Sequence, residues 1–449
     1  MLKTICGSIS AILLCAVIAG GTARADWEKS FAGNGEAQGL SVQQTSDGGY
    51  VVAGYTALNA SGNADVFLVK TDSTGNRTWS KTFGSSGIDT AYSVQPTADG
   101  GYIVAGTTQQ PGHVDFDFYL IKTDAVGNLQ WSKAFGDSGE DYGSAVRLAD
   151  DGGYILAGCR KKVPAAGDLS DAYLVKTDYL GKEMWSKTFD AHQQEHFADV
   201  KPTTDGGYIA VGAAEDNGTG NVYVVKTDTT GAATWSKTLA NSRYDFGQTI
   251  NQTSDGGFVI GATADDNRAR VIKTDSAGSQ EWSQVFSVRG AFATTCQAAI
   301  QTRDGGYALI GMIAETPYDL DACQNGSAGD TDAYLLKTDA AGNETWREIF
   351  DTDGCEGFTD LQQTGDGLYV ITGRQANSAL LIGTSGGPSG PRPGDVDGNG
   401  LIYMRDAILA LQILTGSGSG EVGADVDNDH QIGLEEIIYI TQVIAGLRE

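Results

Sequence analysis

The sequence predicts an all-β fold of seven similar four-stranded units, because three short motifs recur about every fifty residues. The first motif is a turn, Asp-Gly-Gly followed by an aromatic residue. It begins at Asp47, Asp99, Asp151, Asp205, Asp255 and Asp304, and a weaker copy begins at Asp366. The second motif is Lys-Thr-Asp, at Lys70, Lys122, Lys176, Lys226, Lys273 and Lys337. The third is a tryptophan, at Trp79, Trp131, Trp185, Trp235, Trp282 and Trp346.

The second repeat illustrates the unit. Alternating apolar and polar residues predict strands over 91–95, 102–106, 117–122 and 130–135. The turn at Asp99 joins the first two strands, because only glycine readily adopts the positive φ of a tight hairpin. Four antiparallel strands in about fifty residues make one blade of a β-propeller.

The number of blades follows from the two ends of the repeat region. The seventh turn is followed by a third strand over 379–384, but no fourth strand with a tryptophan comes after it. Residues 26–31, which contain Trp27, match the fourth strand of the first repeat over 78–83. The N-terminal strand is therefore predicted to complete the seventh blade and close the ring, which removes the free sheet edges. The propeller spans residues 26–384.

The tryptophans have two interpretations. On a rim they could stack on sugars, or they could pack between neighbouring blades. Their fixed position in the repeat favours packing. The phrase Asp-x-x-Gly-Asn followed by Trp loosely resembles the repeat of quinoprotein-type propellers. The spacing differs from theirs, so the resemblance implies a propeller and not their enzymatic chemistry.

Residues 1–25 are predicted to be a cleaved signal peptide. Lys3 supplies a positive start, 9–18 is apolar, and Ala23-Arg24-Ala25 is an A-x-A cleavage site. The apolar run is too short to span a membrane. We therefore expect a secreted or extracellular protein, with association at a cell surface as an option.

The formal net charge of −27 argues against a nucleic-acid partner, because phosphate binding needs clustered Lys and Arg. The acidic surface is explained mostly by solubility, and it also offers oxygen ligands to calcium.

The longest interruption of the repeat is the sixth-blade insert over 315–331. We predict a disulfide between Cys323 in this insert and Cys355 in the loop that follows the blade. The bond would either pin a binding loop or staple a long insert, and the second interpretation is favoured. Cys159 and Cys296 fall on distant blades and are predicted to be unpaired.

The segment 192–196 contains two histidines and a glutamate, which could bind a metal. No helical pattern holds the histidines on one face, so an ordinary solvated loop between the third and fourth blades is favoured. No Ser-His-Asp set and no glycine-rich phosphate loop is present. The sequence therefore marks no catalytic residue.

A Gly/Ser/Pro linker over 385–393 separates the propeller from a second domain over 394–449. That domain begins with an EF-hand-like loop in which oxygen-bearing side chains recur at positions one, three, five and twelve. The first loop has Asp395, Asp397, Asn399 and Asp406 at these positions, with Leu401 at position seven. The second has Asp425, Asp427, Asp429 and Glu436, with Gln431 at position seven. Each loop leads into an apolar run expected to be helical, so the sequence predicts two Ca²⁺ sites.

The two loop–helix units closely resemble a type I dockerin, a domain that folds on Ca²⁺ and binds a cohesin module of another protein. The resemblance implies calcium as cofactor and a cohesin-like partner. In dockerins, positions ten and eleven of each loop touch the cohesin and are often Ser and Thr. Here these positions hold Met404, Arg405, Leu434 and Glu435. This departure leaves the type of cohesin open.

Two main functions remain, and a purely structural surface protein is a third possibility. The favoured hypothesis is a secreted, non-catalytic recognition or scaffold propeller, tethered through the dockerin-like domain to an extracellular assembly, with polysaccharide degradation as the implied setting. Its ligand would be a glycan or a protein. The alternative is a carbohydrate-active hydrolase or lyase with its site on the face that carries the sixth-blade insert.

Overall fold

The computed structural model describes most of the propeller region and four residues of the C-terminal region. The described residues are 26–31, 37–56, 63–110, 115–136, 139–161, 170–216, 218–239, 244–264, 267–288, 291–317, 330–350, 354–376, 378–386, 410, 411, 413 and 437. The chain divides into two compact units, one of which spans residues 23–389 while residues 390–449 belong to the other.

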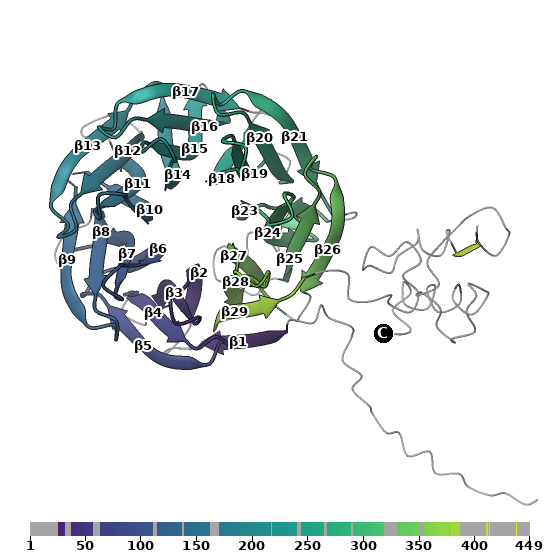
Figure 1. The fold of residues 1–449 in the computed structure, drawn as a ribbon, viewed down its shortest axis with the longest axis horizontal. Helices are drawn as coiled ribbons and strands as arrows, with labels where there is room; N and C mark the ends of the chain where they lie inside the picture. Colours follow the sequence, from purple (N-terminus) through teal and green to yellow (C-terminus); the bar gives the residue numbers. More distant parts are fainter. Residues whose placement is uncertain are drawn as a thin grey trace, which may run out of the picture. The chain divides into compact units, whose positions relative to one another are not determined.

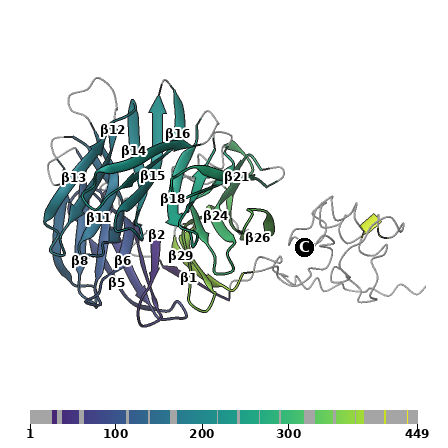
Figure 2. The same cartoon turned by 45° about the horizontal axis from the view of Figure 1, so that its top comes forward.

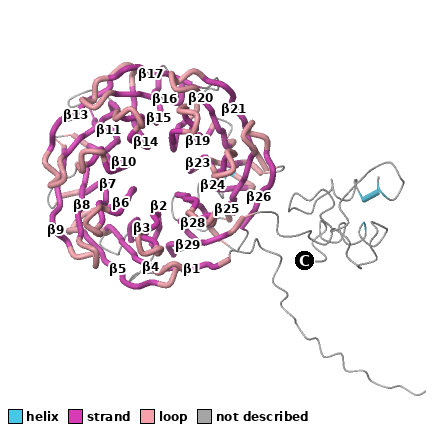
Figure 3. The backbone as a smooth tube through the Cα atoms, viewed as in Figure 1, coloured by secondary structure: helices cyan, strands magenta, loops and turns pink. Residues whose placement is uncertain are grey.

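The described part of the first unit is a seven-bladed β-propeller, as the repeats predicted (Figure 1). Each blade is an antiparallel sheet whose strands run in order from the central opening to the rim, and short loops connect them (Figure 3). Figure 2 shows the blades in an oblique view, with β14 and β18 running along the opening.

The strand bounds follow by blade. Blade 1 has β2 (Ala37–Gln44), β3 (Tyr50–Thr56), β4 (Val66–Thr71) and β5 (Arg77–Phe83). Blade 2 has β6 (Asp89–Pro96), β7 (Tyr102–Thr108), β8 (Asp117–Thr123) and β9 (Leu129–Phe135). Blade 3 has β10 (Asp141–Leu148), β11 (Tyr154–Lys161), β12 (Ser170–Thr177) and β13 (Glu183–Phe189). Blade 4 has β14 (Gln194–Pro202), β15 (Tyr208–Asp216), β16 (Thr219–Thr227) and β17 (Ala233–Leu239).

Blade 5 has β18 (Phe246–Gln252), β19 (Phe258–Thr263), β20 (Ala269–Thr274) and β21 (Gln280–Phe286). Blade 6 has β22 (Ala293–Thr294), β23 (Ala298–Gln301), β24 (Tyr307–Ala314), β25 (Thr331–Thr338) and β26 (Glu344–Phe350). Its inner strand is split, because β22 and β23 both pair with β24. Blade 7 has β27 (Glu356–Gln363), β28 (Tyr369–Gln375), β29 (Ser378–Thr384) and the N-terminal β1 (Trp27–Phe31).

The N-terminal strand closes the ring, which confirms the prediction from the orphan Trp27. β1 pairs antiparallel with β29, from Trp27 opposite Gly383 to Phe31 opposite Ala379. Figure 1 shows this seam where the two ends of the propeller lie side by side. The outermost strand of blade 7 therefore comes from the opposite end of the propeller sequence.

The core lies between the faces of neighbouring blades. In one cluster, Phe118 and Leu120 of blade 2 pack with Val146, Leu156 and Tyr173 of blade 3. The middle strands are buried on both faces, which explains why they are continuous apolar runs in the sequence. The outer strands are partly exposed and alternate.

Every tryptophan packs on the next blade, so the structural interpretation is confirmed. Each indole lies 5.3 to 6.3 Å, centroid to centroid, from the aromatic ring that follows the Asp-Gly-Gly-type turn of the neighbouring blade. Gly127, in the turn between β8 and β9 of blade 2, leaves room for the Trp79 ring of blade 1. Its φ is +78°, and a Cβ there would lie 2.7 Å from the Trp79 ring.

The Lys-Thr-Asp lysine forms an ion pair that the sequence analysis missed. Lys70 is buried, and its Nζ lies 2.8 Å from Asp47 Oδ2 and donates to the Thr71 carbonyl at 2.7 Å. Five further blades repeat the pair at 2.7 to 2.9 Å. The hydrogen bond from Lys70 is the main reason why the pKa of Asp47 falls to about 2. In these six blades the motif therefore joins the first hairpin to the third strand.

Outside the propeller, the described residues Ala410, Leu411, Ile413 and Ile437 are helical. The predicted calcium ligands and cohesin-contact residues of 394–449 lie outside the described residues, as does the signal peptide. The calcium sites and the dockerin-like domain therefore stay predictions. Within the described ranges, none of the helical segments is long and apolar enough to cross a membrane.

Candidate functional site: the axial channel

A channel of about 700 Å³ runs through the middle of the ring, lined by the innermost strand of every blade. Six of these strands contain a β-bulge, which inserts one extra residue and re-aims the side chains that follow it. The residues directly after the bulge line the channel: Ser41, Ser93, Ala145, Asp199, Thr249 and Asp360. So do the residues two positions further on: Gln43, Gln95, Arg147, Lys201, Asn251 and Gln362.

The residues after the bulge also connect neighbouring blades. The Oδ2 atom of Asp360 accepts a hydrogen bond from the backbone N–H of Val42 at 2.9 Å, across the closing junction between blades 7 and 1. Thr249 Oγ1 accepts from the N–H of Ala299 at 3.0 Å in the same way. The polar lining of the channel thus satisfies backbone groups of the next blade.

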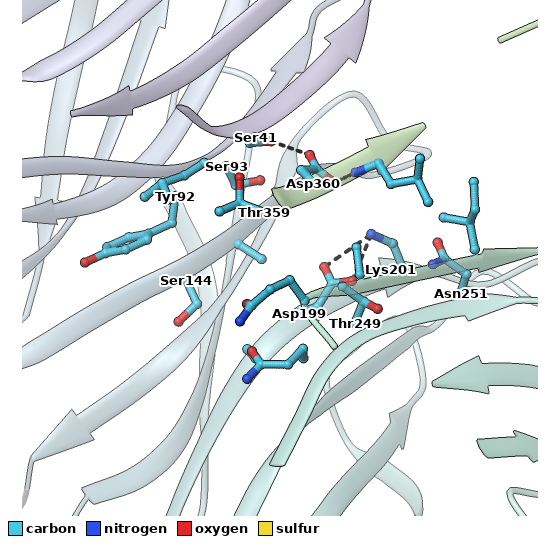
Figure 4. Close-up of a pocket in the computed structure, with 18 of the residues that line it drawn as sticks. Ser41, Tyr92, Ser93, Ser144, Asp199, Lys201, Thr249, Asn251, Thr359 and Asp360 are labelled. Atoms are coloured by element: carbon cyan, nitrogen blue, oxygen red, sulfur yellow. Dashed lines mark hydrogen bonds and ion pairs between the residues drawn. The ribbon is translucent and has the colours of Figure 1, made fainter. Parts of the chain in front are cut away.

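Four charged residues from three blades line the channel, and three of them, Asp199, Lys201 and Asp360, are labelled in Figure 4. Asp199 lies 2.7 Å from Arg147 Nη2 and 2.9 Å from Lys201 Nζ. Arg147 Nη1 also donates to Ser93 Oγ at 2.8 Å, which links blades 2, 3 and 4. Burial lowers the pKa of Lys201, and the neighbouring Arg147 adds to this, while Asp199 opposes it.

Asp360, from blade 7, is held differently. Its carboxylate accepts from Ser41 Oγ at 3.0 Å and from the backbone N–H groups of Val42 and Leu361, each at 2.9 Å. Burial raises its pKa, while those bonds and the charges of Arg147 and Lys201 oppose the increase. Both channel carboxylates are therefore hydrogen-bonded on both oxygens, which suits a fixed recognition surface more than proton transfer.

The segment 192–196 differs from the sequence prediction. It was predicted to be a solvated loop, but Glu195 and His196 lie on the inner strand β14, and Glu195 is fully buried. His192 Nδ1 lies 2.5 Å from Asp216 Oδ2, whereas His196 lines the channel. Because alternate residues of a strand point to opposite faces, the two histidines and the glutamate do not form one metal site.

The cysteines agree with the prediction as far as the structure describes them. Cys159 and Cys296 are free. Cys355 is disulfide-bonded. Cys323 lies outside the described residues, so its pairing with Cys355 stays a prediction. The described ends of the sixth-blade insert and the following loop do lie together, since Thr331 donates its N–H to the Gly354 carbonyl at 3.0 Å.

Sequence reasoning missed Arg147, Asp199, Lys201 and Asp360. A signal was present, because these charges replace Ser, Thr, Gln or Asn at equivalent positions of the other inner strands. Aligning the strands past the bulge would have revealed them.

The fold and the channel define the class of protein, a seven-bladed β-propeller with a polar, charge-paired axis. No described protein family matches the sequence. Part of the chain is 25% identical over 203 residues to the regulatory protein FlaEY of Caulobacter vibrioides, a match that covers 39% of this chain and 21% of that protein. The chain thus matches only about a fifth of that curated relative's length.

Solved structures with a similar chain path include Sqt1 from Chaetomium thermophilum, with a TM-score of 0.48 and 14% identity over 80% of this chain and 98% of that chain. A protein of unknown function from Bacteroides caccae matches with a TM-score of 0.42 and 11% identity, over 70% of this chain and 94% of its own. Puromycin hydrolase matches with a TM-score of 0.43 and 13% identity, over 78% of this chain and 61% of its own.

Proposed function

We propose that this protein is a secreted, non-catalytic recognition propeller. A C-terminal dockerin-like domain would anchor it, in a Ca²⁺-dependent way, to a cohesin-bearing extracellular or cell-surface assembly. Its ligand would be a glycan or a protein, and the setting implied by the dockerin resemblance is polysaccharide degradation.

The recognition role rests on one observation, which is that the charged side chains of the channel are held by hydrogen bonds and ion pairs. Arg147, Asp199, Lys201 and Asp360 are bonded to one another, to hydroxyls or to backbone N–H groups. A general acid or base needs a carboxylate free to reach the substrate. Fixed charges, side-chain amides and an exposed aromatic ring are suited instead to orienting a polar ligand. No specific observation favours the alternative, a hydrolase or lyase on the sixth-blade face.

Tyr92 is the bulge residue of β6 and lines the channel, with 43% of its surface exposed (Figure 4). An exposed ring in a channel that is also lined by amides such as Asn251 and Gln95 matches the usual composition of a carbohydrate or peptide site. The ring takes part in none of the channel ion pairs described above, so replacing it leaves the charged network intact.

The recognition role is tested with the full-length chain on glycan and peptide arrays, with released sugar measured in parallel. We expect retention of a ligand without sugar release. Tyr92→Ala should weaken retention about tenfold. Tyr179→Ala, which removes a tyrosine that is 64% exposed outside the channel lining, should leave it unchanged. Catalytic release of sugar by the wild type would reject the non-catalytic role.

The anchoring role rests on the two EF-hand-like loops, which begin thirty residues apart at Asp395 and Asp425 (425 − 395 = 30). Calorimetric titration of the full-length chain should show two fewer Ca²⁺ sites in the Asp395→Ala, Asp425→Ala double variant than in the wild type. Cohesin capture by the wild type in Ca²⁺, and its absence in EDTA or in the double variant, would support the anchor. Unchanged Ca²⁺ binding by the double variant would refute the dockerin interpretation.

A further inference from the structure

Acidic residues face one another at several junctions between blades. In each facing pair, the first residue lies at the start of the third strand of one blade. The second lies at the start of the inner strand of the next blade. At the first junction these are Asp65 and Asp89. A Cβ on Gly84, which follows the outer strand β5, would lie 2.1 Å from Asp65 Oδ1 and 2.9 Å from Asp89 Oδ2.

The second junction repeats this arrangement. A Cβ on Gly136, which follows β9, would lie 2.2 Å from Asp117 Oδ1 and 2.7 Å from Asp141 Oδ2. The position after the outer strand therefore points between the two carboxylates, and a glycine leaves that space open.

The junction between blades 3 and 4 is different. Asp171 and Glu195 occupy the positions of the facing acids, and Asp190 follows β13 where the first two junctions have glycine. Each of these three residues offers a carboxylate oxygen, and the three oxygens lie within 4.8 Å of one another. A third carboxylate has been added to an acidic pair, and carboxylates this close make one another harder to ionise.

Glu195 supplies independent evidence for a ligand. The residue is 0% exposed, and its Oε1 atom accepts the backbone N–H groups of Ala191, at 2.8 Å, and His192. Its Oε2 atom is buried and has no hydrogen-bond partner among the residues that the structure describes. A buried carboxylate oxygen without a partner is rare, because it loses its water without compensation.

The matching buried acids at neighbouring junctions are paired with cations. Asp141 lies 3.2 Å from Arg160 Nε, and Asp245, at the junction of blades 4 and 5, lies 3.4 Å from Arg270 Nε. Arg160 also lies over the Tyr173 ring, with its Cζ 4.1 Å from the centroid. Burial raises the pKa of Glu195, and the Asp171 charge contributes, although the backbone N–H bonds oppose the increase.

We infer that Asp171, Asp190 and Glu195 form a Ca²⁺ site that joins blades 3 and 4. Ca²⁺ lies about 2.3–2.6 Å from its oxygen ligands, so two ligands on opposite sides of the ion are about 5 Å apart, and the three carboxylates can reach it without rearrangement. Asp190 is exposed, so water can enter and complete the coordination shell. The site is separate from the predicted C-terminal loops and does not depend on the proposed function.

The test uses the full-length chain carrying Asp395→Ala and Asp425→Ala, so that the predicted C-terminal loops do not contribute. Calorimetric titration with Ca²⁺ should show one remaining site per chain. Asp190→Gly, which recreates the glycine of the first two junctions, should weaken its affinity at least tenfold, and Glu195→Gln should abolish binding. Asp141→Asn, a matched acid at the preceding junction, should retain it.

A thermal melt of the same variants gives a second readout. At ten times the dissociation constant, Ca²⁺ should shift the unfolding equilibrium of the background chain about elevenfold toward the folded state. At the same Ca²⁺ concentration this shift should be no more than about twofold in Asp190→Gly. This variant removes a side chain and relieves charge repulsion, so it is expected to fold. The inference is overturned if the background chain binds no Ca²⁺, or if Asp190→Gly and Glu195→Gln bind it as tightly as Asp141→Asn does.

Discussion

The closing seam of the ring offers a sharp test, because its outer strand has only five residues. Phe31, at the end of β1, is 5% exposed and packs in a cluster with Tyr50, Val52 and Leu381. Phe83 holds the equivalent position at the end of β5 in blade 1 but is only partly buried. Replacing each by alanine compares the seam with an ordinary blade.

The expected cost follows from burial. Removing a buried Phe side chain destabilises a protein by about 3–5 kcal/mol, and the end of a short strand can relax, so we expect about 3 kcal/mol for Phe31→Ala. For the partly buried Phe83, less apolar surface is lost, and we expect about 2 kcal/mol. Loss of β1 would also expose the edge of β29 and promote association.

Urea unfolding of the full-length chain, followed by tryptophan fluorescence, measures both effects. The free energy of unfolding should fall further for Phe31→Ala than for Phe83→Ala, and size-exclusion chromatography should show oligomers only for Phe31→Ala. Equal losses of stability in the two variants would refute the idea that the seam depends on this contact.

Three further predictions test the scaffold. The pKa of Asp47 is lowered to about 2, so its Lys70 pair should stabilise the fold above about pH 4 and lose this effect as the pH falls toward 2. Thermal melts from pH 5 to 2 should fall less steeply for Lys70→Met, and an unchanged slope would contradict the pairing. Asp199→Asn should destabilise the chain by about 3–5 kcal/mol, because Arg147 and Lys201 lose a buried counter-charge. Ser144→Ala, in the same channel, is its control in urea unfolding, and equal effects would argue against the network. Gly127→Ala should lower the melting temperature more than Gly152→Ala. Both glycines have positive φ, but a Cβ on Gly152 has nothing within 4 Å, whereas a Cβ on Gly127 meets the Trp79 ring. Equal decreases in melting temperature would therefore mean that only the backbone strain matters.

The repeat pattern determined the architecture without any tertiary information. The Asp-Gly-Gly turns mark hairpins through a local backbone requirement, and the strands follow from a period of two, both of which are properties of neighbouring residues. Trp27 revealed the closing strand because it lacks a turn of its own. These signals are local, so one blade suffices to interpret the others.

Only the tertiary structure decided which side chains meet. The bulge in six of the inner strands shifts the register by one residue, and a shift of one residue changes the face to which every following side chain points. Arg147, Asp199 and Asp360 come from three different blades and converge because the ring brings equivalent strand positions to one axis. Glu195 was expected in a loop, but it is buried at a blade junction beside Asp171 and Asp190. The repeats therefore specify each blade. The geometry of the closed ring determines the channel and the junction sites, because each of them is built from side chains of different blades.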